Sequence, residues 1–118
     1  MGAAAIPENE PERLASLLTL KVLDTGPEEE FDALVHAASL VCEVPISLIS
    51  LIDQDRQWFK ANVGLEGVSE TDRSSAFCAH AIHGVEIFEV PDAQADDRFN
   101  SNPLVTGAPD IRDRKSVV

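Results

Sequence analysis

Apolar residues recur at helical spacing in two segments near the start of the chain. In the first, the leucines of residues 14–18 fall three or four positions apart, which predicts one face of an amphipathic helix. A second helix is predicted to end before Pro45, and its apolar stripe comprises Phe31, Leu34, Val35, Ala38, Val41 and Cys42. Thr25 followed three residues later by Glu28 predicts a capping box at the start of that helix.

The pattern then changes to that of strands. Residues 46–52, ISLISLI, are apolar on both faces and rich in β-branched side chains, which predicts a central strand. After a polar turn, residues 57–63, QWFKANV, alternate and are predicted to pair back as an antiparallel hairpin. Further on we expect a short helix over 76–83, a strand over 85–90 and a helical turn near 97–101. Helices around an antiparallel sheet place the chain in the α+β class.

Length and charge restrict the classes of function. The chain has 118 residues, enough for one domain, and carries 21 acidic against 9 basic residues, for a formal net charge of −12. Binding to a nucleic-acid backbone needs clustered Lys and Arg, so we expect no nucleic-acid partner. No apolar run approaches the length of a bilayer span, so no membrane contact is expected. Two cysteines are too few for a secreted disulfide framework, which predicts a reduced, cytoplasmic protein.

Cys78, His80 and His83 lie within six positions and raise the question of a metal site. On a helix, Cys78 and His80 point in nearly opposite directions, and on a strand His83 points away from the other two. A structural zinc site needs four converging ligands, so we expect neither a metal nor another cofactor here. The simpler interpretation is that Cys78 is a small buried apolar residue and that the histidines are polar or line a pocket.

The strand at 57–63 leaves two interpretations open. Arg56, Trp58 and Lys60 alternate on one face and could form an aromatic, cationic surface for an anionic ligand or a partner helix. Alternatively, Trp58 packs under a helix and the charges are solvated. We favour a solvated Lys60 and leave the role of Trp58 open.

Several motifs in order resemble a bacterial GAF domain. They include the segment from ERLASLLTLKVLDTG to DQDRQWFKANVGL, then AFCAHAI, VPDAQADDRF and NPLVTGAPDIR. The subgroup that they resemble opens sensor histidine kinases and diguanylate cyclases. The resemblance covers residues 12–112, which leaves a flexible lead at 1–11 and an atypical tail at 113–118. It implies a regulatory fold that binds a small molecule or a partner protein, and a homodimer formed through terminal helices or an open sheet edge.

The resemblance also implies a truncation, because GAF domains usually continue beyond the PDIR motif with further strands and a closing helix. We therefore expect a partial, non-enzymatic signal-sensing module with no catalytic residues, which relays to an output domain not present in this chain. The predicted ligand-lining residues are Phe59, Phe77, Cys78, His80 and Asp92. Two alternatives stay open: a thiol redox enzyme of the free methionine-(R)-sulfoxide reductase type using Cys78, and a degenerate fragment without function. Cys42 counts against the redox enzyme, because a thiol on a buried helix stripe is poorly placed to resolve a sulfenic acid.

Overall fold

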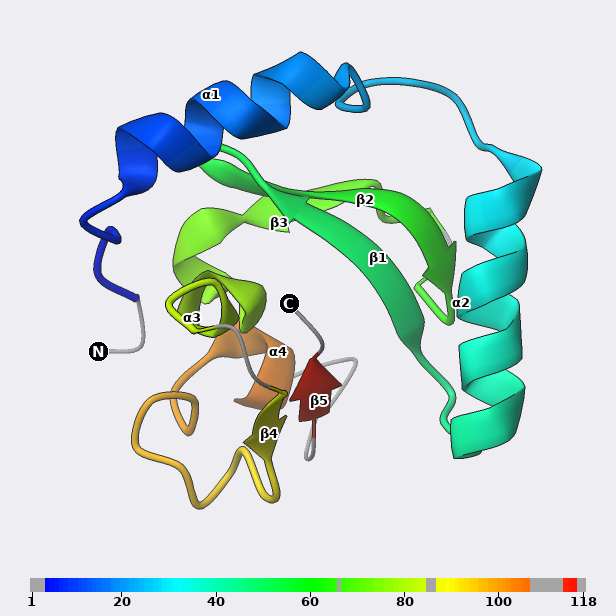
Figure 1. Cartoon of the computed structure of the whole chain (residues 1–118). Helices are drawn as coiled ribbons and strands as arrows, with labels where there is room; N and C mark the ends of the chain where they lie inside the picture. Colours follow the sequence, from blue (N-terminus) through cyan, green and yellow to red (C-terminus); the bar gives the residue numbers. More distant parts are fainter. Residues whose placement is uncertain (1–3, 66, 85–86, 107–113, 117–118) are drawn as a thin grey trace. The chain divides into compact units, whose positions relative to one another are not determined.

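A computed structural model describes residues 4–65, 67–84, 87–106 and 114–116 of the chain. The chain forms two compact units, one comprising Asn9–Thr71 and the other Met1–Glu8 together with Asp72–Val118. Helices and antiparallel strands occur in both, so the predicted α+β class is confirmed (Figure 1). Among the described residues, no helix is long and apolar enough to cross a membrane.

The first unit opens with the two predicted helices, α1 (Glu10–Leu20) and α2 (Glu29–Cys42). Each ends at a residue in the left-handed conformation, Lys21 and Glu43 respectively, whose backbone N–H bonds back to the last turn of the helix. The predicted capping box is wrong. Glu28 is the N-terminal cap and makes no side-chain cap bond, whereas the Thr25 hydroxyl donates to the carbonyl of Val22.

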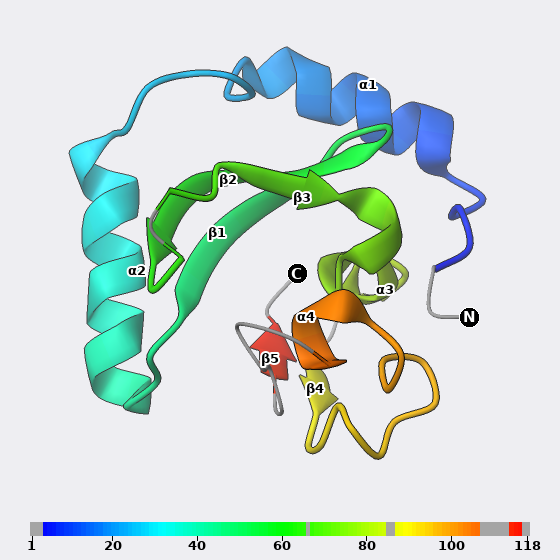
Figure 2. The ribbon, with the colours of Figure 1, turned by 180° about the vertical axis from the view of Figure 1, so that it is seen from behind.

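The sheet of the first unit has three strands, β1 (Ser47–Ile52), β2 (Arg56–Val63) and β3 (Glu70–Asp72), in the order β1-β2-β3. The predicted antiparallel hairpin is confirmed as β1 and β2, with an irregularity between Ile49 and Ser50. The prediction that residues 46–52 form the central strand is wrong, because β2 lies between the other two (Figure 2). β2 is buried on both faces over residues 57–61, whereas most of β1 is half-buried.

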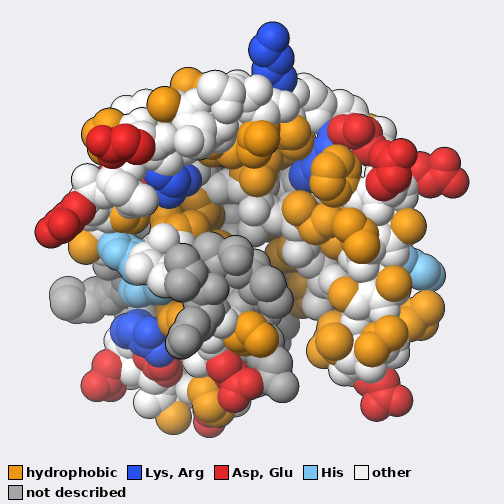
Figure 3. Space-filling view, viewed as in Figure 1, with side chains coloured by type: hydrophobic (Ala, Val, Ile, Leu, Met, Phe, Trp, Pro, Cys, Tyr) orange, Lys and Arg blue, Asp and Glu red, His pale blue; other side chains and the backbone are white. Residues whose placement is uncertain are grey.

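Helix α2 packs against β1 and β2, but it buries far less of its apolar stripe than predicted. Val35 is buried, at 3% exposure, and Phe31 is half-buried, whereas Leu34 and Val41 are 61% and 83% exposed. Cys42 is also exposed, which corrects its predicted place on a buried stripe. Neighbouring residues on a helix point about 100° apart, so a narrow sheet that covers Val35 leaves Leu34 outside. Hydrophobic side chains therefore gather on the outer surface of α2, at the right of Figure 3.

The second unit consists of short elements: a 3-10 turn at Arg73–Ser75, α3 (Cys78–Ala81), β4 (Phe88–Val90), α4 (Pro103–Thr106) and β5 (Arg114–Ser116). β4 and β5 pair antiparallel. The apolar core of this unit comprises Phe77, Val90, Ala93, Phe99 and Val105. The predicted strand at 85–90 is confirmed over Phe88–Val90, and its residues 85 and 86 lie outside the described residues. Of the predicted tail, only the backbone of β5 is described, and the boundary at residue 12 stays a prediction.

The predicted helical turn near residues 97–101 is present, because the backbone N–H groups of Phe99 and Asn100 donate to the carbonyl of Asp96 at 2.9 and 2.8 Å. A separate helix, α4, follows and begins after Asn102. Asn102 Oδ1 accepts from the backbone N–H of Leu104 at 2.9 Å, and its carbonyl accepts from that of Thr106 at 3.0 Å. Asparagine is a strong helix cap, so this residue sets the start of the helix.

Candidate functional site

Two of the predicted ligand-lining residues, Phe77 and His80, both pack against Phe99, which was not among the predicted site residues. Phe77, at 1% exposure, stacks on Phe99 with ring centroids 4.2 Å apart and planes 3° apart. His80 meets the same ring edge-on, at 4.9 Å and 77°. Cys78 is half-buried at the start of α3. Phe99 is fully buried, and its position as a large aromatic in a run of polar loop residues was a signal that could have been used.

The other two predicted lining residues have different surroundings. Asp92 is exposed, and its Oδ1 accepts from the backbone N–H of Gln94 at 3.0 Å, which is a turn-stabilising role. Phe59 belongs to β2 in the first unit and is buried, at 7% exposure. Within the second unit, the structure therefore groups Phe77 and His80 but not Asp92. The ligand-lining role of all five residues stays a prediction.

Arg98 closes the aromatic cluster from one side. Its guanidinium lies 5.1 Å from the ring centroids of both Phe88 and Phe99, a cation–π arrangement. The same group binds Asp96 through Nη2–Oδ2 at 2.7 Å and Nε–Oδ1 at 3.0 Å. These hydrogen bonds from Arg98 lower the pKa of Asp96 below its ordinary value. The aromatic rings pack the surrounding loops together, and the guanidinium of Arg98 at the edge of this cluster is already paired with Asp96.

Cys78, His80 and His83 do not converge. His80 packs on Phe99, whereas the Nε2 atom of His83 lies 2.8 Å from the carbonyl oxygen of Ala5. Within residues 4–65, 67–84, 87–106 and 114–116, no three His, Cys, Asp or Glu side chains are placed to hold a metal ion. The expected lack of a metal rests on this divergence and on the sequence, and it stays a prediction.

A second group of polar residues is centred on Arg56, at the start of β2. Its guanidinium binds both carboxylate oxygens of Asp24, at 2.8 and 2.9 Å. Nε donates to Asp53 at 3.0 Å, and Nη1 also donates to Glu70 at 3.0 Å. Arginine pairs carboxylates well because its planar fork offers several donors at once. One cation therefore ties the α1–α2 loop, the β1–β2 turn and β3 together.

These contacts shift the acid–base behaviour of both partners. The hydrogen bonds from Arg56 hold the pKa of Asp24 below its ordinary value of 3.8. In return, the hydrogen bonds to Asp24 and Asp53 raise the pKa of Arg56 well above its usual range.

Lys60 is held in a similar way further along β2, and this corrects our expectation that it is solvated. Its side chain is only 1% exposed, and Nζ lies 2.7 Å from Oε2 of Glu28. The ammonium also donates to the Thr25 hydroxyl at 2.7 Å and to the Gly26 carbonyl at 2.6 Å. The α1–α2 loop folds back over β2 and supplies these oxygens. Trp58, on the same strand face, is buried at 8% exposure, and its packing under a helix stays a prediction.

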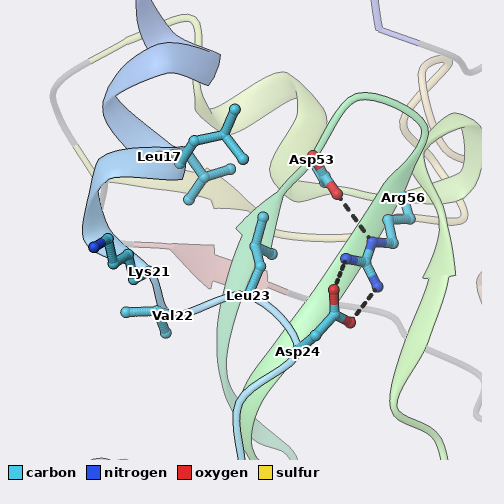
Figure 4. Close-up of a pocket in the computed structure, with 8 residues that line it drawn as sticks. Leu17, Lys21, Val22, Leu23, Asp24, Asp53 and Arg56 are labelled. Carbon is cyan, nitrogen blue, oxygen red and sulfur yellow. Dashed lines mark hydrogen bonds and ion pairs between the residues drawn. The ribbon is translucent and has the colours of Figure 1, made fainter.

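A surface hollow of about 270 Å³ opens beside Arg56 (Figure 4). It lies between the end of α1, the following loop and the β1–β2 turn, and its walls are formed by Leu17, Leu18, Lys21, Val22, Leu23, Asp24, Asp53 and Arg56. No local sequence pattern indicates this hollow, because its walls come from segments some thirty residues apart. None of the predicted lining residues belongs to it.

Comparison with known proteins adds a relative but no family. No family model matches the chain. The chain is similar to the cyclic di-GMP phosphodiesterase PA2567 of Pseudomonas aeruginosa, with 44% identity over 112 residues. The match covers 95% of this chain but only 19% of the relative, so the chain spans about a fifth of that protein's length.

This relative corrects one of our expectations. We expected a protein that is not an enzyme, but the matching protein is named as a phosphodiesterase, which contradicts that expectation. The GAF assignment has no matching family model and stays a prediction. What the comparison establishes is that the chain is similar to part of a cyclic di-GMP signalling protein.

Proposed function

We propose that this chain is a regulatory module of a protein that acts in cyclic di-GMP signalling. The observation that carries the proposal is the 44% identity to a segment of a cyclic di-GMP phosphodiesterase across 95% of the chain. A segment that makes up 19% of such a protein can regulate the remainder by binding a ligand or a partner. The resemblance of the motifs to GAF domains supports the same role.

The contacts of β2 suggest how such a module could relay binding. Arg56 and Lys60 fix the loop between α1 and α2 to the strand, through Asp24 and Glu28 respectively. A ligand that changes either contact would alter the connection between the two helices. Arg56 also lines the hollow, so binding there would act directly on one of these contacts.

A domain exchange tests the proposal. The segment of the Pseudomonas phosphodiesterase that matches this chain is replaced by this chain, and hydrolysis of cyclic di-GMP is measured with purified protein. We expect the exchange to preserve hydrolysis and deletion of the segment to change its rate several-fold. A third protein, with an unrelated folded domain of the same length, controls for spacing.

Two results would contradict the regulatory role. One is an equal rate in the parent enzyme, the exchange, the deletion and the unrelated insertion, because then the segment regulates nothing. The other is loss of hydrolysis in the exchange together with full activity in the unrelated insertion.

A further inference from the structure

We propose that the hollow beside Arg56 binds a small amphipathic carboxylate, which takes the place of Asp24 on the guanidinium and lays its apolar tail against the leucines. This inference names a ligand class for the proposed regulatory module. Its biological meaning rests on that proposed function, but the binding does not. The binding itself can be measured on this chain alone.

Arg56 has hydrogen-bond partners other than Asp24. Asp53 accepts from Nε and Glu70 from Nη1, so both would keep the guanidinium in place without Asp24. Asp24 occupies the Nη1–Nη2 edge, where two parallel donors face the hollow (Figure 4). A planar carboxylate from a ligand fits that edge as well as the aspartate does.

Asp24 is well suited to be displaced. Its side chain is 67% exposed, so a released carboxylate returns to water without having to leave a buried position. Its backbone has a φ of 61°, in the left-handed region that Asp and Asn adopt more readily than other non-glycine residues, so the backbone can keep this conformation when the side chain is released. The released Asp24 carboxylate stays attached to the chain, so binding adds one negative charge to a chain of formal net charge −12, and this favours a ligand with a single negative charge.

The wall opposite Arg56 selects for an apolar tail. Leu17 is buried at 8% exposure, Val22 and Leu23 are half-buried, and Leu18 is 65% exposed. Ligand pockets for drug-sized molecules commonly have about 300–1,000 Å³, so a hollow of about 270 Å³ suits a smaller molecule. Asp53 and Glu70 would remain beside the bound head group, and they disfavour a dianion such as phosphate relative to a single carboxylate.

The test is titration of the isotopically labelled chain with hexanoate, followed by NMR of the Arg56 Nε–H and of the methyl groups of Leu17 and Leu23. We expect saturable shifts at these positions with hexanoate. Hexanol, hexylamine and inorganic phosphate serve as controls, and we expect none of them to shift the Arg56 signal.

The decisive variant is Asp24→Asn, because asparagine tolerates the same backbone conformation but no longer competes as an anion. We expect it to bind hexanoate several-fold more tightly than the parent. Arg56→Gln should abolish binding, and thermal unfolding of both variants shows whether they are folded. Equal affinity in parent and Asp24→Asn, or shifts by hexylamine as large as those by hexanoate, would overturn the proposal. Such a result would leave the domain exchange in the phosphodiesterase unaffected, so the two proposals fail separately.

Discussion

The ammonium of Lys60 and the carboxylate of Glu28 form an ion pair of 2.7 Å in which the lysine side chain is 1% exposed and the glutamate 48% exposed. The lysine lies on the middle strand of the sheet, and the glutamate is the N-terminal cap of α2. A buried ammonium needs oxygen partners in place of water, and the loop before α2 supplies them. The start of α2 is therefore fixed to β2 by a polar contact as well as by apolar packing.

The first prediction concerns this ion pair. Glu28→Gln should lower the free energy of unfolding by about 1–3 kcal/mol, because it leaves a buried cation with weaker partners. Urea unfolding followed by tryptophan fluorescence measures the change. Glu29→Gln is the matched control, since it removes a neighbouring exposed carboxylate at the same helix end and should change stability by less than about 0.5 kcal/mol. Equal effects of the two variants would show that the pair contributes nothing specific.

The second prediction concerns acid pH. The pKa of Asp24 is lower in the folded chain than its ordinary value of 3.8, because of its hydrogen bonds to Arg56. Its stabilising contribution is therefore fully present above that value and is lost as the pH falls through the folded-state pKa. In Asp24→Asn, the urea midpoint of unfolding should decrease less steeply below about pH 4 than in the parent. Near neutrality, the dependence of this midpoint on pH should be the same in both proteins. High salt should likewise make the acid decrease less steep in the parent, because the Asp24 carboxylate is 67% exposed to the solvent ions. An unchanged acid slope in the variant would contradict this.

The third prediction concerns Phe99, the centre of the aromatic cluster. Phe99→Ala should destabilise the second unit by about 3–5 kcal/mol, because it removes the ring on which Phe77 and His80 pack. Phe99→Leu keeps most of the volume and should cost clearly less. Hydrogen exchange of the amides around α3 and α4 measures the effect locally. Protection that is equal in both variants and the parent would show that the cluster does not hold this unit together.

The fourth prediction concerns the outer surface of α2. Leu34, Leu40 and Val41 are 61%, 67% and 83% exposed, and exposed apolar patches promote association. We expect the isolated chain to associate as its concentration rises, and Leu34→Lys together with Val41→Lys to reduce that association. Light scattering across a concentration series distinguishes the two proteins, with Glu29→Lys as a control for charge alone. A parent chain that is monomeric throughout the series would contradict the prediction.

The fifth prediction concerns metal. Because Cys78, His80 and His83 face different partners, purified protein should contain far less than one zinc ion per chain. Elemental analysis of protein prepared without chelator measures this directly. Stoichiometric zinc that disappears in His80→Ala would show that the three residues converge after all.

The sequence predicted those elements that depend on local periodicity. The leucines of residues 14–18, the apolar spacing up to Pro45 and the alternation at 57–63 identified both long helices and the hairpin, since amphipathic helices and strands repeat with fixed periods. Periodicity indicates which apolar residues share one face of a helix. It does not indicate how much of that face the neighbouring sheet will cover. That is why Leu34 and Val41 were placed with Val35 on one buried stripe and are exposed in the structure.

The candidate site was decided by tertiary structure alone. Lys60 reads as a solvated strand residue until the α1–α2 loop folds over it and supplies Glu28 as a partner. Arg56 likewise acquires Asp24 from a segment 32 positions earlier, and no local pattern links the two. A buried charge is stable only where distant oxygen atoms replace its water, and only the folded chain brings those atoms to it.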